Sequence, residues 1–171
     1  HGFMVDRNGR KMSKSLGNTL EVEELLKELG ADVCRWWVAS LNVDNDIKVD
    51  WSFFKLAGEE YRKVRNTIRF LLSNLGDFEP EKHNYEFTDA DAASIDAWVL
   101  DELMELVDEV RRSFERYAYR KANEALFNFC NETLSAVYLA AVKDRLYCDK
   151  PDAPRRRRTQ TAMHRIADAL T

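Results

Sequence analysis

The sequence predicts a mainly α protein in which an antiparallel helical bundle follows a short β-hairpin, a loop and two short helices. Three observations predict this fold. Apolar residues recur every three or four positions over 51–75, 95–117 and 119–145, the spacing of helices with one buried face. All six glycines lie at or before Gly76, so no glycine interrupts the later helices. Long helices with short connections favour antiparallel neighbours.

Composition limits the possible functions. With 171 residues the chain is long enough for a buried core, and its net charge of −4 excludes a general nucleic-acid binder, so any RNA contact needs a local basic face. Cys34, Cys130 and Cys148 lie far apart, which predicts no metal site within the chain and a reducing, cytoplasmic environment. No apolar run approaches the roughly 18 residues of a membrane helix, so we predict no membrane partner.

The N-terminal segment predicts a hairpin. Residues 3–6 form a short, largely apolar run, and Asn8-Gly9 is a strong two-residue hairpin signal. We therefore expect a strand, a tight turn and a return segment that enters Lys11–Ser15. No further sheet is expected for it to join, and because an isolated hairpin is marginal in water, we expect it to be mobile or to use a neighbour.

Two short helices should follow. Asn18 or Thr19 is the expected cap of the first, and Gly30 is its natural stop. The second is predicted over Val33–Ser40, and its paired tryptophans at 36 and 37 favour a packing role. Residues 41–50 are predicted to be a loop with a short extended piece at 47–49.

The first long helix should begin at Asp50 or Ser52 and end near Leu75, before Gly76. The side opposite its apolar stripe carries mostly basic residues, namely Arg62, Lys63, Arg65, Asn66 and Arg69. Two interpretations remain open for this basic face. It is either solvated, or it binds a nucleic-acid backbone with salt-dependent affinity.

The remaining helices follow an acidic loop over 76–93. One is expected over 95–117, and another over 119–145, where Asn131–Thr133 is a candidate interruption. The inward residues of the second are predicted as Ala122, Leu126, Phe129, Thr133, Val137 and Ala141.

The last helix is expected from Arg155 to Leu170, after the helix-excluding prolines at 151 and 154. Arg155–Arg158 lies at its N-terminal end, where positive charge opposes the helix dipole. Water or a bound phosphate would compensate this charge.

The segment Lys11–Ser15 is the strongest candidate site. It brings two lysines and two hydroxyls together, next to Gly17 and before a helix whose amide N–H groups favour anions. Cationic donors, small hydroxyls and a flexible backbone suit a polyphosphate. The alternative is a solvated basic loop, because short basic motifs often occur without function.

The string Lys11-Met12-Ser13-Lys14-Ser15, followed by Leu16-Gly17-Asn18, resembles the KMSKS signature of class I aminoacyl-tRNA synthetases. The segment 30–37 is also similar to the one that follows this loop in synthetases. By this resemblance the loop closes over ATP, with Mg²⁺, during amino-acid activation, and all five residues Lys11, Met12, Ser13, Lys14 and Ser15 bind ATP. Lys14 would be catalytic, stabilising charge on the leaving pyrophosphate.

Two further stretches narrow the family. Tyr61–Leu75 and Tyr138–Tyr147 resemble isoleucyl-tRNA synthetases, and valyl and leucyl enzymes match them less well. The resemblance implies that 1–50 is the tail of a Rossmann-type catalytic domain with stem-contact helices. It implies that 51–171 is a truncated helical bundle of the class I synthetase anticodon-binding type.

The implied partners are tRNA-Ile, ATP and isoleucine. Four basic residues are the predicted tRNA contacts, chosen by charge and helix position: Arg65, Arg69, Lys143 and Arg145.

The chain begins without methionine and contains no H-I-G-H motif, so we expect it to be part of a longer enzyme. Alone, it should not catalyse pyrophosphate exchange, because a transition-state lysine needs a nucleotide pocket. A truncated bundle would also leave an apolar groove through which copies self-associate. The alternatives are a valyl- or leucyl-type synthetase, or a non-catalytic tRNA-binding bundle with a vestigial loop.

Overall fold

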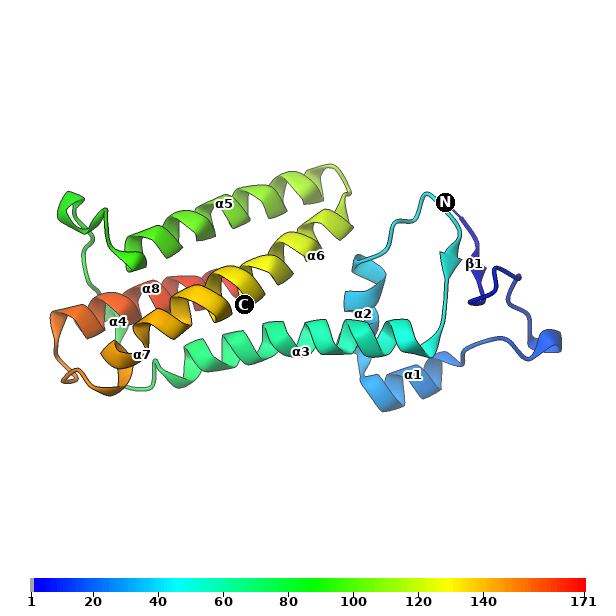
Figure 1. Cartoon of the computed structure of the whole chain (residues 1–171), viewed down its shortest axis with the longest axis horizontal. Coiled ribbons are helices and arrows are strands. Elements are labelled where there is room, and N and C mark those ends of the chain that lie inside the picture. The colour runs from blue at the N-terminus through cyan, green and yellow to red at the C-terminus, as the bar shows by residue number, and fades with distance from the viewer. Residues whose placement is uncertain (1) are drawn as a thin grey trace. The chain divides into compact units, whose positions relative to one another are not determined.

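The protein was analysed as a computed structural model that describes residues 2–171, and helices dominate it (Figure 1). The chain forms two compact units. The first contains the N-terminal residues through Arg62 together with Ser113–Glu124, and the second contains Lys63–Arg112 and Ala125–Thr171. Each unit has its own buried apolar cluster.

The first unit opens with the predicted hairpin. Strand β1 (Met4–Val5) is followed by a turn in which the Asp6 amide donates to the Arg10 carbonyl over 2.8 Å, and an isolated antiparallel bridge joins Val5 to Lys11. Gly9 occupies the turn with φ of 79°, a left-handed conformation that suits glycine. The Asn-Gly signal therefore predicted this turn correctly.

The hairpin does pair with a neighbouring strand, which was one of the two predicted outcomes, and only the expectation that no sheet would be available to it is wrong. Strand β1 pairs in parallel with β2 (Ile47–Lys48), with Met4 opposite Ile47 and Val5 opposite Lys48. The Ile47 amide donates to the Phe3 carbonyl and the Val49 amide to the Val5 carbonyl, each over 2.8 Å. The pairing satisfies backbone groups that an isolated hairpin would leave open, and it confirms the extended piece predicted at 47–49.

The two short helices are α1 (Val22–Leu29) and α2 (Ala31–Ala39). Gly30 separates them with φ of 83°, as predicted for a helix stop. The predicted cap at Asn18 or Thr19 is wrong, since Glu21 occupies the N-cap position without a side-chain cap. Asn18 instead forms hydrogen bonds within the preceding loop.

The core of the first unit confirms a packing role for the tryptophan pair. Trp37 is buried among Leu25, Val33, Val49, Phe54 and Ala57, and its ring centroid lies 4.2 Å from that of Phe54. Trp36 is half-buried, and its indole N–H donates to Glu60 over 3.2 Å.

Helix α3 (Trp51–Ser73) begins as predicted. The Asp50 carboxylate accepts from the Ser52 amide over 2.9 Å and so caps the first turn. The helix is continuous through residues of both units. Its buried stripe is Phe54, Ala57, Val64, Thr67 and Leu71, while Phe53 and Leu72 are exposed.

The second unit is the predicted antiparallel bundle (Figure 1). After α4 (Pro80–His83) and a 3₁₀ turn at Asp89–Asp91, it contains α5 (Ile95–Glu115) through Arg112, the end of α6 (Tyr119–Asn128) from Ala125, a π-helical segment (Phe129–Tyr138), α7 (Leu139–Tyr147) and α8 (Pro154–Leu170). One apolar cluster joins residues of α3, α5, the π-helical segment, α7 and α8, including Leu71, Val99, Leu134, Val142 and Met163.

The π-helical segment corrects part of the predicted core. The helix is not interrupted at Asn131–Thr133 but changes its winding there. Because π-helical bonds run from i to i+5, the buried face shifts along the sequence. Leu134, Tyr138 and Val142 are fully buried in place of the predicted Thr133, Val137 and Ala141.

The arginines at the start of α8 are neutralised by carboxylates of the chain itself, so the prediction of water or phosphate there is wrong. Arg155 pairs with Asp149 at 2.5 Å, Arg156 with Asp77 at 3.0 Å, and Arg158 with Asp91 at 2.7 Å. The partners come from three other connections of the fold. These ion pairs therefore fix the N-terminal end of α8 against its surroundings.

A buried carboxylate organises the same end of the bundle. Asp96, at the start of α5, is fully buried. It accepts from four groups: the Tyr138 hydroxyl (3.0 Å), Arg145 (2.7 Å), Arg158 (2.9 Å) and the Thr159 hydroxyl (2.9 Å). Because the donors come from three helical segments, this group links α5 to the π-helical segment, α7 and α8.

The helical stretch Tyr119–Tyr147 is long and apolar enough, by length and composition alone, to cross a membrane. This stretch is not one continuous apolar run in the sequence, because neutral polar residues such as Asn131 and Thr133 are interspersed in it. A single such helix is weak evidence, since core helices pass the same test. Here Cys130, Leu134 and Tyr138 are buried in the bundle core.

Candidate functional site

The Lys11–Ser15 segment adopts a compact loop in the first unit. Residues Lys14–Leu16 form one 3₁₀ turn, and the Ser13 hydroxyl accepts from the Leu16 amide over 3.3 Å. The Ser13 and Ser15 hydroxyls lie 3.1 Å apart. Gly17 closes the turn with φ of 62°, so a glycine is well suited there. Both hydroxyls and both lysines are thus brought onto one short loop.

Asp6 and Asn18 hold the two ends of this loop together, and we call this pair the Asp6–Asn18 latch. The Asn18 side chain accepts from the Ser13 amide over 2.9 Å and donates to Asp6 over 3.1 Å and to the Lys11 carbonyl over 3.2 Å. Sequence analysis missed this role. The available signal was Asp6 two residues before Asn8-Gly9, a typical position for a carboxylate that accepts turn amides.

Hydrogen bonds keep Asp6 ionised. The Arg10 amide and the Asn18 side chain, with further donors from Arg10 and Asn8, lower the pKa of Asp6 to about 2. Its carboxylate accepts from the Asn8 and Arg10 amides over 2.9 Å each. At neutral pH the latch therefore includes a full negative charge that can accept several donors at once.

We expect an NMR titration of the Asp6 carboxyl to show a midpoint near 2, and Asn18→Ala to move that midpoint toward 3.8. A carboxyl whose folded pKa is depressed contributes stability above its unfolded pKa and loses it as pH falls through the folded value. The latch should therefore weaken between pH 3.8 and 2. Asn84→Ala, an exposed site far along the sequence, is the control. A wild-type midpoint near 3.8 would contradict the assignment.

The lysines of the loop remain available for an anion. Lys11 and Lys14 are exposed, and within residues 2–171 neither ammonium lies within 4.0 Å of a carboxylate. Two uncompensated cations beside two hydroxyls suit the polyphosphate of ATP. The prediction that the amide N–H groups of a following helix assist anion binding is wrong. Helix α1 begins only at Val22, and its first turn carries the negative charges of Glu23 and Glu24.

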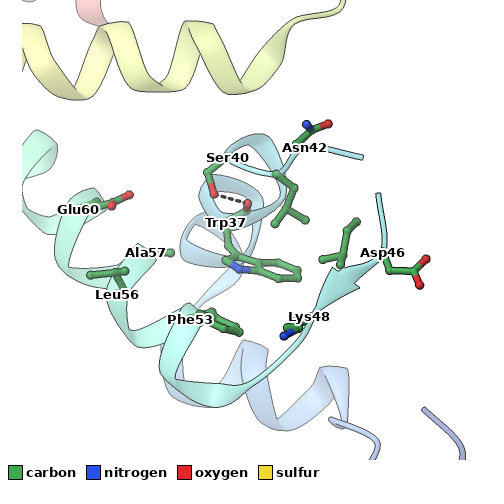
Figure 2. Close-up of a pocket in the computed structure, with 11 residues that line it drawn as sticks. Trp37, Ser40, Asn42, Asp46, Lys48, Phe53, Leu56, Ala57 and Glu60 are labelled. Atoms are coloured by element: carbon green, nitrogen blue, oxygen red, sulfur yellow. Dashed lines mark hydrogen bonds between the residues drawn. The ribbon is translucent and has the colours of Figure 1, made fainter. Parts of the chain in front are cut away.

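A separate hollow of about 340 Å³ lies in the first unit between the end of α2, β2 and α3. Figure 2 shows the Trp37 ring in the middle of this hollow, with Leu56 and Ala57 of α3 on one side and Lys48 of β2 on another. The Ser40 hydroxyl donates to the Trp37 carbonyl over 2.7 Å. No residue of Lys11–Ser15 lines the hollow, so it is distinct from the loop.

In the second unit, α3 and the π-helical segment with α7 enclose a groove of about 340 Å³, which we call the Lys63–Lys143 groove. Its polar lining residues are Lys63, Asn66, Thr67, Asn131, Ser135 and Lys143. The Lys63 ammonium lies 5.6 Å from the Phe127 ring centroid, which helps to hold it in place. Two cations that line one groove can bind phosphates of a nucleic-acid strand.

The predicted tRNA contacts separate into three groups. Lys143 lines the Lys63–Lys143 groove. Arg65 and Arg69 are exposed on α3 but do not line it. Arg145 is largely buried in its ion pair with Asp96, so the structure gives it an internal partner. Sequence analysis missed Lys63 and Asn66 as groove residues, although both were placed on the polar side of this helix.

No group of three or more His, Cys, Asp or Glu side chains that could hold a metal ion occurs in the described part of the chain. Burial raises the pKa of the Cys130 thiol to about 12, so this cysteine stays protonated in the core. The groups of the Lys11–Ser15 loop that can bind a ligand are its lysine ammonium groups and serine hydroxyls.

Two family models match the chain. Residues 1–50 match "tRNA synthetases class I (I, L, M and V)", and residues 96–171 match "Anticodon-binding domain of tRNA ligase". The chain is 45% identical over 170 residues to the isoleucine–tRNA ligase of Carboxydothermus hydrogenoformans. The chain belongs to the class I aminoacyl-tRNA synthetases. It is also 44% identical to the isoleucine–tRNA ligase of Desulforudis audaxviator, and both alignments cover 99% of this synthetase chain.

This synthetase chain spans 18% of the length of each of those two relatives. Among solved structures it is similar to LeuRS from Agrobacterium radiobacter, determined as a ternary complex with tRNA and LeuAMS. The TM-score is 0.67 at 20% identity, over 99% of this chain and 20% of that one. At this identity the likeness supports the fold, which agrees with the mainly α, anticodon-binding-type bundle predicted from the sequence.

Proposed function

We propose that the chain is the part of an isoleucine–tRNA ligase that closes over ATP and contacts the stem of tRNA-Ile. In this proposal residues 1–50 are the end of the catalytic domain and 51–171 are the helical anticodon-binding domain. The observation that carries it is the exposed pair Lys11 and Lys14, uncompensated by carboxylates within residues 2–171, on a loop that the Asp6–Asn18 latch holds closed at its base. The relatives at 44–45% identity, named isoleucine–tRNA ligases, support the choice of amino acid.

Bound ATP, with Mg²⁺, would supply the adenylyl group for isoleucine and a pyrophosphate leaving group. Within this chain, Lys14 is the catalytic residue, because an ammonium that reaches the phosphates as charge develops stabilises the transition state more than the ground state. Lys11, Ser13 and Ser15 bind the same phosphates through their ammonium and hydroxyl groups. The Met12 backbone, which also contacts ATP in this proposal, connects Lys11 to Ser13. The half-buried Met12 packs against the apolar core of the first unit and so anchors the loop.

The bundle would contact tRNA mainly through charge. Lys63 and Lys143 face one groove, and Arg65 and Arg69 extend from the exposed side of α3. Phosphate contacts of this kind position the nucleic acid without reading its sequence. Arg145 is omitted from this set because its guanidinium is 2.7 Å from the Asp96 carboxylate.

The test is binding of the chain to a tRNA-Ile transcript, titrated against salt, with a non-cognate tRNA in parallel. We expect Lys63→Ala combined with Lys143→Ala to make the log–log salt dependence shallower by about 2, since each phosphate-contacting lysine contributes about 1. Lys82→Ala combined with Arg112→Ala removes the same charge from residues that pair with Glu79 and Glu109, and is the control. An unchanged slope in the groove variant would exclude this interface.

We further propose a cytoplasmic location and self-association of the chain. An apolar hollow of about 330 Å³ beside the end of α8 supports the second point. It is lined mainly by Leu103, Leu106, Val107, Val110, Leu126 and Leu170. A second copy could cover this surface. Light scattering over a concentration series tests it, and a constant monomer mass would refute it.

A further inference from the structure

The turn between α5 and α6 exposes three aromatic rings in the first unit. Phe114 is 56% exposed, Tyr117 79% and Tyr119 45%. The Tyr119 ring meets the other two edge to face, with centroids 5.2 Å from Phe114 and 6.3 Å from Tyr117. A tyrosine ring that large and that exposed gains little from packing inside its own chain. The cluster therefore offers ring surface to something outside the turn.

Tyr117 also holds an unfavourable backbone conformation. Its φ is 57°, and it is the only non-glycine residue with positive φ within residues 2–171. Its amide donates to the Phe114 carbonyl over 3.0 Å, and the Ala118 amide donates to the Ser113 carbonyl over 2.8 Å. This is the hydrogen-bond pattern of a helix end that usually has glycine at this position. A bulky side chain at a strained backbone position suggests a functional role for the Tyr117 ring.

Two of the rings, Tyr117 and Tyr119, line a cavity of about 520 Å³ formed by two segments of the first unit, which we call the Tyr117 pocket. One wall is residues 116–121 with Glu124, and the other is the loop 41–44. Arg116 and Arg120 are exposed there and form no ion pair with the part of the chain that the structure describes. The cavity has the size of ligand-binding pockets in general.

The polar groups of the pocket can read a flat heterocycle. The Asn42 side-chain oxygen accepts from the Asp44 amide over 3.1 Å, which leaves its NH₂ group to donate to a ligand. Asp44 adds an acceptor at the same wall. A ring surface, two guanidiniums and an amide donor together match the base and phosphate of a nucleotide.

We propose that the Tyr117 pocket binds an unpaired nucleotide of RNA. The base stacks on the exposed face of Tyr117 or Tyr119, and Arg116 and Arg120 bind the flanking phosphates. This inference rests on the proposed tRNA-binding function and adds a second contact to it, in a different unit from the Lys63–Lys143 groove. Unpaired nucleotides are the suitable ligands, because bases in a duplex do not offer their faces for stacking.

The decisive variant is Tyr117→Gly. Glycine relieves the positive φ, so the variant should melt at the same temperature as the wild type or higher, while the ring is lost. We expect its affinity for a short single-stranded oligouridylate, followed by fluorescence anisotropy, to fall about tenfold. Tyr147→Ala removes another exposed tyrosine (64%) from the second unit and should leave this affinity unchanged. A blunt RNA duplex should bind both chains equally.

The same series separates this proposal from the proposed function. If wild type and Tyr117→Gly bind oligouridylate equally, or if neither binds it, the pocket proposal is overturned even when tRNA binds through the groove. If Tyr117→Gly alone loses oligouridylate binding while the groove variant leaves the tRNA salt slope unchanged, the pocket is supported and the groove interface fails.

Discussion

Lys14→Ala, introduced into an isoleucine–tRNA ligase that contains this chain, is expected under the proposed function to lower the rate of isoleucyl-adenylate formation by about 10²–10³-fold. The ammonium is exposed and, within residues 2–171, has no carboxylate partner, so its charge is available to the phosphates. Because the interaction strengthens as pyrophosphate leaves, kcat should fall more than KM for ATP rises. ATP–pyrophosphate exchange measures both quantities.

Two matched variants sharpen this experiment. Lys14→Arg keeps the charge on a different head group and should retain part of the activity. Lys27→Ala removes an exposed lysine from α1, outside the loop, and should leave exchange unchanged. Full activity in Lys14→Ala would show that the loop cation has no role in the chemical step.

The largest expected loss of stability is for Asp96→Ala. The substitution leaves the guanidiniums of Arg145 and Arg158 without the carboxylate that both contact at less than 3 Å. Removing one partner of a buried ion pair costs about 3–5 kcal/mol, chiefly because the remaining charge stays buried. Urea unfolding followed by circular dichroism should therefore show a much lower midpoint.

The control lies on the same helix. Asp101→Ala removes an exposed carboxylate from α5 and should change the free energy of unfolding by less than about 0.5 kcal/mol. Tyr138→Phe removes only one neutral donor to the Asp96 carboxylate and should cost about 1.5–3 kcal/mol. Equal stability of Asp96→Ala and wild type would mean that this end of the bundle reorganises freely.

Local signals in the sequence predicted much of the fold. Asn8-Gly9 predicted the turn, Gly30 the helix stop, and the three-to-four spacing over 51–75 predicted α3. These features depend on residues close together in the chain, whose turn and helix preferences act directly. The same holds for the Lys11–Ser15 loop, which was recognised from five consecutive residues.

What was missed depends on distant residues. The parallel pairing of Met4 with Ile47 joins residues separated by two helices, and Arg158 finds its carboxylates at Asp91 and Asp96. Periodicity also assumes constant helix winding, so the π-helical segment displaced the predicted core residues after Phe129. No local pattern near Arg145 indicates that its guanidinium pairs with the Asp96 carboxylate, 49 positions earlier in the chain.

The Asp6–Asn18 latch determines at which step the loop loses its conformational entropy. It joins residues 12 positions apart, so the segment between them is already closed into a ring in the folded chain. The entropic cost of that closure is met during folding and not when the nucleotide arrives. Interaction energy between Lys14 and the phosphates is then free to act on the reaction itself, which is the advantage of preorganisation.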